Sequence, residues 1–176
     1  RSVARVHLSM KSLEWKWGLL IGGANVVWLV LSWLIGMHGN GLGLIQVMFV
    51  VSFFLSLVGY VFAFRAILLA EPETSFVEGI RSGAIIAGLS AILAILGQVL
   101  YFTLLNPAWT DYLVGLTRQH YEAMGINAAQ LEPLLSQARA AYGFQNYVVQ
   151  SGLGALLLGM IFSAVLMGAF RWRARR

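Results

Sequence analysis

The feature that most constrains this chain is a set of four long apolar segments. A helix needs about 20 mostly apolar residues to cross a hydrocarbon core of about 30 Å, and segments of this length cover residues 17–37, 44–64, 83–105 and 148–170. Hydrophobic residues make up 59% of the 176 residues and charged residues only 11%. A soluble globule of this size lacks the interior to bury so much apolar surface. We therefore predict an all-α, polytopic membrane protein whose four transmembrane helices form a single domain over residues 1–176.

Local signals predict where the second and third helices end and begin. Glu71 and Pro72 mark the expected end of the second helix, beyond the membrane edge. Ser75 and Glu78 have the spacing of a capping box, which opens the third helix. The turn at residues 37–43 holds three glycines and no charged residue, so we expect a tight hairpin between antiparallel helices.

The more polar segment 107–143 separates the third and fourth spans. Asn106 and Pro107 predict a helix start, because Asn can cap and Pro fits the first helical position. Gly125 is placed to end that helix, and Asn127 to cap a second one that Gly143 stops. We expect an extramembrane helical hairpin, folded onto the membrane surface or onto itself, and a loosely ordered loop is the alternative.

The distribution of Lys and Arg predicts the orientation in the membrane, because cytoplasmic flanks carry an excess of these residues. With both termini on one side, the other side holds only Arg118 and Arg139. The terminal side holds ten basic residues: Arg1, Arg5, Lys11, Lys16, Arg65, Arg81, Arg171, Arg173, Arg175 and Arg176. We therefore expect both termini in the cytoplasm. Residues 1–9 are expected to be an upstream extension or a cloning remnant, because Met10 and Lys11 directly precede the first span.

Three sequence stretches resemble a known family. The chain has a short basic start, MKSLEWKWGLLIG, then ETSFVEGIRSGAIIAG at the third span, and YFTLLNPAWTDYL where that span ends. The pattern is similar to the DUF4199 family of small bacterial membrane proteins, whose members have a similar SF-x-E-x-x-x-x-G start and an aromatic-rich exit ending in Asn/Asp-Pro. The external segment of this chain is shorter and less charged than in that family. The resemblance implies a bacterial inner membrane protein of unknown function and supplies no catalytic residue.

The sequence offers no enzyme chemistry. Cysteine is absent, which excludes disulfides and thiol nucleophiles. No metalloprotease, P-loop, hydrolase or dinucleotide motif occurs, and we expect no cofactor and no metal site. Ionisable residues are absent from the centres of the four spans, which argues against a proton-coupled exporter. Glu14 is expected to stay solvated at the interface, beside Trp15 and Lys16.

One set of candidate site residues is charged and lies at the membrane edge. Arg65, Glu78 and Arg81 are expected to form either an interfacial ion-pair cluster, with the arginines reaching lipid phosphates, or a site for an anionic lipid headgroup. The net charge of +5 points to the membrane surface rather than to nucleic acid, because the basic residues sit beside the apolar segments.

Two further sets lie inside the spans. Small residues spaced for close helix packing include Gly18, Gly22, Gly83, Gly88 and Gly159. A polar stripe is expected from Asn25, Ser52, Ser56, Tyr60 and Gln98. Ser52, Ser56 and Tyr60 are spaced four residues apart and therefore share one helical face.

Three functions follow as hypotheses. The first is a packing or accessory subunit, partnered by a second copy or by another membrane protein, because small-residue faces are many and buried charge is absent. The second is a transporter or channel for a small neutral or mostly apolar solute, motivated by the polar stripe. The third is an anionic-lipid-binding protein that uses the Arg65 and Arg81 cluster.

Overall fold

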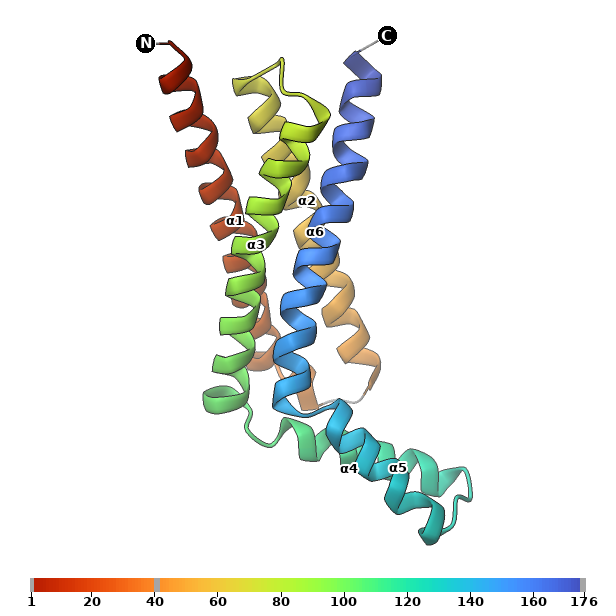
Figure 1. The fold of residues 1–176 in the computed structure, drawn as a ribbon. Helices are drawn as coiled ribbons and strands as arrows, with labels where there is room; N and C mark the ends of the chain where they lie inside the picture. Colours follow the sequence, from red (N-terminus) through yellow and green to blue (C-terminus); the bar gives the residue numbers. More distant parts are fainter. Residues whose placement is uncertain (1, 40–41, 175–176) are drawn as a thin grey trace.

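The structure, a computed structural model, describes residues 2–39 and 42–174, and within them all regular secondary structure is helical (Figure 1). Arg1, Gly41, Arg175 and Arg176 lie outside the described residues. In chain order the elements are α1 (Ser2–Leu34), the 3₁₀ turn η1 (Met37–Gly39), α2 (Leu42–Ala70), α3 (Phe76–Leu100), the π-helical turn η2 (Tyr101–Leu105), α4 (Trp109–Ala123), α5 (Ala128–Ala141) and α6 (Phe144–Ala174).

Four helices are long and apolar enough to cross a membrane, which confirms the predicted fold class. The candidate spans are Lys11–Leu34, Gly43–Ala70, Phe76–Leu105 and Phe144–Trp172. In Figure 1, α1 begins and α6 ends at one end of the bundle, here called the terminal end. The short helices α4 and α5 lie at the opposite end, here called the hairpin end. The chain is thus a multi-pass helical membrane protein.

The helix ends confirm some of the local predictions and correct others. Ser75 and Glu78 form the predicted capping box at the start of α3, and α2 ends at Ala70, directly before Glu71. The first membrane helix ends at Leu34, before the predicted residue 37. The reason is Gly36, whose φ of 79° takes the backbone out of the right-handed helix.

The expected start of the extramembrane hairpin was wrong in detail. Asn106 does not cap a helix, because α4 begins at Trp109 with Ala108 before it and no side-chain cap. The Asn106 side-chain amide instead donates to the Tyr101 hydroxyl. The later signals are confirmed, since Gly125 has a φ of 77° just after α4 and Asn127 caps α5 through Gln130 N–H.

The hairpin is helical and packs both on itself and on the bundle. Val114 of α4 is buried against Leu131 and Leu135 of α5. Trp109 and Leu113 of α4 join a second buried cluster with Tyr101 and Ile45. A loosely ordered loop in this segment is therefore excluded, and the hairpin packs against the bundle through Trp109 and Leu113.

Close packing at the terminal end depends on glycines of α1, α3 and α6. A Cβ atom added at Gly18 or Gly22 would collide with Leu89 or Leu93 of α3, and one at Gly83 or Gly159 with side chains of neighbouring helices. Gly88 corrects the expectation, because a Cβ there would meet nothing within 4 Å. Its face of α3 lies on the outside of the bundle, so no other helix of the chain approaches it.

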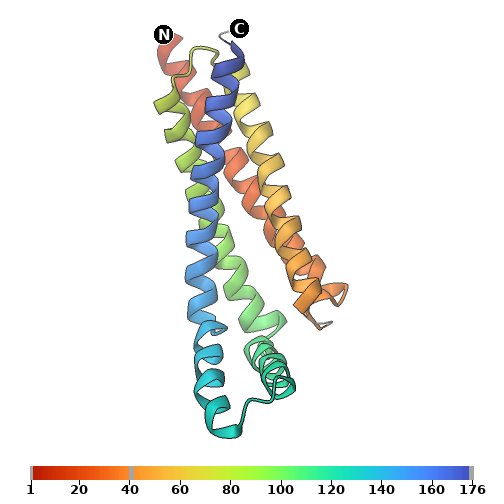
Figure 2. The same cartoon turned by 90° about the vertical axis from the view of Figure 1, so that its right-hand side faces the viewer.

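This packing arranges the four membrane helices as two pairs, α1–α2 and α3–α6. α3 packs most extensively on α6 and then on α1, whereas α2 and α6 contact each other much less. Figure 2 shows the α1–α2 pair diverging from the α3–α6 pair toward the hairpin end. The gap between the pairs contains the candidate site.

Candidate functional site

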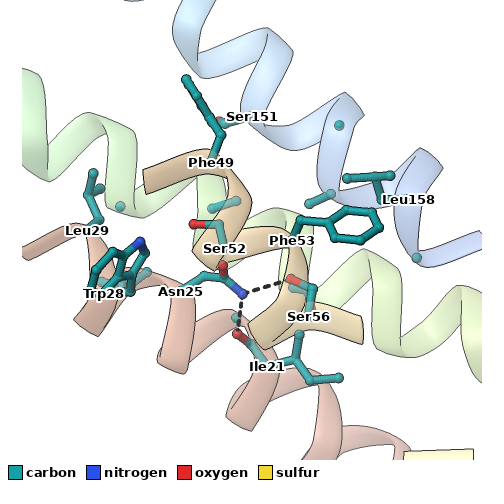
Figure 3. Close-up of a pocket in the computed structure, with 18 of the residues that line it drawn as sticks. Ile21, Asn25, Trp28, Leu29, Phe49, Ser52, Phe53, Ser56, Ser151 and Leu158 are labelled. Atoms are coloured by element: carbon teal, nitrogen blue, oxygen red, sulfur yellow. Dashed lines mark hydrogen bonds between the residues drawn. The ribbon is translucent and has the colours of Figure 1, made fainter. Parts of the chain in front are cut away.

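A cavity of about 630 Å³ lies between the two helix pairs, in the middle of the bundle. All four membrane helices contribute to its lining, and most of that lining is apolar. Figure 3 shows residues of α1 and α2 facing this space, with Ser151 and Leu158 of α6 on the other side. Its size falls within the range of about 300–1,000 Å³ typical of small-molecule sites.

The cavity brings together every member of the expected polar stripe. Asn25, Ser52, Ser56, Tyr60 and Gln98 all line it. The α6 helix completes the set with Gln150 and Ser151, which lie one turn from Gly154 and Ala155 on the same face. This one-turn spacing of polar and small residues is the sequence signal that would have added α6 to the predicted site.

Some of these polar groups are paired and others are not. The Asn25 side-chain amide donates to the Ile21 carbonyl oxygen and to the Ser56 hydroxyl, both at 3.0 Å (Figure 3). In the part of the chain that the structure describes, the side chains of Ser52, Gln98 and Gln150 make no hydrogen bond to protein. They therefore retain donors and acceptors for a molecule in the cavity, because polar groups at membrane depth gain from a partner.

The lining carries no charge. No Lys, Arg, Asp, Glu or His is among the residues that line the cavity. An ion placed there would lose its hydration without gaining a counter-charge, which costs far more than burying a neutral polar group. The chemistry of the site therefore favours an uncharged molecule with a few hydrogen-bonding groups.

Apolar side chains of α2 and α6 that line the cavity also reach the surface of the bundle. Phe49 and Phe53 of α2 are 62% and 39% exposed, and Leu158 of α6 is 38% exposed. These apolar side chains line the cavity and also face outward where lipid surrounds the bundle. A molecule dissolved in the membrane could enter here without passing through water.

Comparison with known proteins places the chain in a family. The model of the family described as "Protein of unknown function (DUF4199)" matches residues 16–171. The chain belongs to the DUF4199 family. No curated protein and no solved structure matches it. The resemblance expected from the sequence is confirmed, and the matched region of this DUF4199 protein contains the whole cavity lining.

The charged residues predicted at the membrane edge lie apart from the cavity. Arg65 of α2 and Arg81 of α3 have exposed side chains at the terminal end. The Glu78 carboxylate accepts a hydrogen bond from the Ser75 backbone N–H at 2.7 Å, as part of the cap of α3. The two arginines do not line the cavity, so the charged and polar sets are separate features of this DUF4199 protein.

The prediction that Glu14 stays solvated was wrong. Glu14 is only 4% exposed, and its carboxylate accepts a hydrogen bond from the Ser82 hydroxyl of α3 at 2.6 Å. Its neighbours Trp15 and Lys16 are exposed, but Glu14 shares the α3-facing side of α1 with Gly18, four residues on. The helical face, rather than the position near the membrane edge, decides its burial.

Sequence reasoning also missed His38, which was assigned only to a turn. The structure buries its ring among Ser32, Tyr101 and Trp109 at the hairpin end. Within the described residues, no group of three or more His, Cys, Asp or Glu side chains lies close enough to hold a metal ion.

Proposed function

We propose that this DUF4199 protein is a non-enzymatic carrier of the bacterial inner membrane that binds a neutral, mostly apolar molecule taken from the surrounding lipid. Both termini lie in the cytoplasm in this proposal, because ten of the twelve basic residues flank the terminal end. The observation that carries the proposal is the uncharged cavity between the helix pairs, with its apolar walls and unpaired polar groups.

The cavity suits an amphiphile with one chain and a neutral head. Its aromatic and aliphatic walls complement a hydrocarbon chain, and lipid already supplies such molecules at high local concentration. Ser52, Gln98 and Gln150 offer hydrogen bonds to a hydroxyl or carbonyl group. In this proposal the few polar groups determine which molecule the cavity selects. The affinity comes from the fit of the molecule to the shape of the cavity and from the hydrogen bonds that it satisfies.

The packing-subunit hypothesis has less support from this geometry. Its main argument was the number of small-residue faces available to a partner. Gly18, Gly22, Gly83 and Gly159 are occupied by helices of the same chain, so these faces do not need a second protein. Arg65 and Arg81 remain exposed at the membrane edge, where they can contact lipid phosphates without forming a ligand site.

Photolabelling in liposomes tests the proposal. The probe is hexadecanol with a diazirine on its chain, and the charged comparison is the corresponding hexadecyl sulfate. We expect ultraviolet light to attach the alcohol to α2 and α6 peptides that line the cavity, and to attach much less of the sulfate. Saturation by unlabelled hexadecanol separates a site from bulk lipid contact.

Two glycines of α6 provide the matched variants. A Cβ at either Gly154 or Gly168 meets nothing within 4 Å, but only Gly154 lines the cavity. Gly154→Leu should therefore fill the cavity and reduce saturable labelling at least about tenfold, equivalent to about 1.4 kcal/mol. Gly168→Leu should label like the wild type. Equal labelling of both variants, or equal labelling by alcohol and sulfate, would contradict the proposal.

A further inference from the structure

A buried polar cluster joins the two helix pairs at the end where they diverge. His38 follows α1 and is 5% exposed, and Tyr101 of η2 is 2% exposed. The His38 Nδ1 atom and the Tyr101 hydroxyl form a short hydrogen bond. Ser32 of α1, which is fully buried, lies 3.0 Å from His38 Nε2 through its hydroxyl oxygen. The ring of Trp109 from α4 packs on His38 with 5.3 Å between ring centroids.

The hydrogen bonds of the cluster define which His38 nitrogen carries the proton. We assign the proton to Nε2, because the Ser32 hydroxyl, while it donates to the Leu29 carbonyl oxygen at 2.9 Å, can then accept from His38. The Nδ1 atom is then an acceptor and receives the Tyr101 hydroxyl proton. Asn106 donates to the same hydroxyl oxygen at 2.8 Å. Every donor has an acceptor when His38 is neutral.

Protonation of His38 breaks this arrangement. An N–H at Nδ1 would face the Tyr101 hydroxyl proton, and the hydroxyl oxygen already accepts from Asn106. The Tyr101 proton would have to turn away into an apolar cluster, where a stranded polar group is costly.

Among the described residues, the printed contacts of the His38 ring include no charged side chain that would compensate for this loss. The groups that face the His38 ring are Ser32 from α1, Tyr101 from η2 and Trp109 from α4. Of these only Tyr101 titrates. Asp111 of α4 is exposed and bound to Arg139 at 2.6 Å.

We propose that His38 is a pH-sensitive clamp that holds the α1–α2 pair against the α3–α4 junction and releases it when protonated, widening the cavity between the helix pairs. Ser32 connects the clamp to the site, because it bonds to His38 and also lines the cavity. The proposal rests on the proposed function for what would enter, but the movement itself does not depend on any ligand.

The direction of the pH effect follows from burial. Burial lowers the pKa of His38 from its ordinary 6.5 to about 4, whereas a released and hydrated His38 titrates near about 6.5. The released state therefore binds more protons between these values, and its population rises as pH falls from about 6.5 toward about 4. Above about pH 6.5 His38 is neutral in both states, and the clamp has its full stability.

Distance measurements between spin labels test the clamp in reconstituted protein. The chain has no cysteine, so Val47→Cys on α2 and Val149→Cys on α6 give one labelled pair at exposed sites of the hairpin end. We expect one short distance at pH 7.5 and a growing longer-distance population below about pH 6.5. A second pair at the terminal end, Leu69→Cys and Val165→Cys, should keep its distance, because that end is closed by glycine packing.

Two substitutions identify His38 as the cause. His38→Gln cannot be protonated and should abolish the pH dependence. If this variant does not fold, Tyr101→Phe removes the donor to Nδ1 and should move the onset of the longer distance to higher pH. An unchanged distance from pH 7.5 to 4, a pH response that persists in His38→Gln, or simultaneous opening at the terminal end would overturn the proposal. Hexadecanol labelling at pH 7.5 reports on the cavity separately, so the two proposals can fail independently.

Discussion

The terminal half and the hairpin half of the bundle contain similarly apolar helices but differ in how the helices meet. At the terminal end, Tyr60, Phe64, Ile86 and Met167 form one buried cluster from α2, α3 and α6. Toward the hairpin end the pairs separate around the cavity, and the cluster that includes Tyr101 and Trp109 joins them again. The side chains at the helix contacts differ between these two regions.

Side-chain size differs between the contacts at Gly18 and Gly83 and the stretch of α2 that borders the cavity. Gly18 and Gly83 let α1, α3 and α6 approach closely at the terminal end. Where α2 faces α6 nearer the hairpin end, it presents Phe49 and Phe53 instead. In lipid, helices associate through close contact rather than by escaping water. Small residues therefore produce the close contacts at Gly18 and Gly83, whereas Phe49 and Phe53 border the cavity.

The largest expected effect is the opening of the closed half by Gly83→Leu. A side chain there would overlap Ser163 and press on Phe64, and overpacking costs typically about 1–3 kcal/mol. We expect a loss near about 3 kcal/mol in the free energy of unfolding, measured by denaturant titration in mild detergent. Gly168→Leu is the control, and equal stability of both variants would disprove the role of close packing.

A smaller loss in the free energy of unfolding is expected when the polar contact within the closed half is removed. Ser82→Ala deprives the buried Glu14 carboxylate of its hydrogen bond from α3, and stranding a buried polar group costs about 1–3 kcal/mol. We expect Ser82→Ala to lower the free energy of unfolding by about 2 kcal/mol in the same denaturant titration. In the Glu14→Gln background the cost of Ser82→Ala should fall, because the stranded group is then neutral. An equal cost in both backgrounds would show that the two side chains are not coupled.

Replacing a glycine with leucine in the open half should raise stability, whereas the same replacement lowers it in the closed half. A Cβ at Gly154 meets nothing within 4 Å, so Gly154→Leu should fill part of the cavity, and removing a glycine from a helix stabilises by about 0.5–1 kcal/mol. The expected outcome is a small rise in thermal stability together with the loss of hexadecanol labelling. Destabilisation comparable to that of Gly83→Leu would mean that the cavity closes in the membrane.

The smallest effect on stability is expected from a substitution outside both halves, in the extramembrane hairpin. Arg139 and Asp111 form an ion pair whose side chains are 61% and 68% exposed, and exposed pairs contribute about 0–1 kcal/mol. Arg139→Ala should lower stability by no more than about 0.5 kcal/mol, and the difference should vanish in high salt. A larger or salt-independent loss would show that α4 and α5 depend on this pair.

Much of this fold was predictable because length, apolar content and helix caps are local properties. The spans, the capping box at Ser75 and the cap at Asn127 each depend on residues close together in sequence. Gly88 has the same local pattern as Gly83, yet its face meets no other helix. Which of two small-residue faces is used depends on the rotation of α3 against its neighbours, and one sequence does not contain that information.

The candidate site was predictable only in part, for the same reason. The polar side chains could be named, but not the divergence of the helix pairs that leaves space beside them. The hydrogen-bond partner of His38 on η2, Tyr101, lies 63 residues away, and no local pattern indicates such a pairing. Glu14 shows the reverse error, because flanking residues suggested an interfacial position while its own helical face is buried.

The parallel pairing of α1 with α3 has a consequence for biosynthesis. The ribosome releases the first two spans before the third exists, so the first hairpin enters the bilayer without the helix that covers Gly18, Gly22 and Glu14. During that interval the carboxylate has no hydroxyl partner and must stay near the aqueous boundary or be held by the insertion machinery. Arrival of α3 then supplies the Ser82 hydroxyl and covers the glycine face, so the first helix reaches its final packing only once the third span has been made.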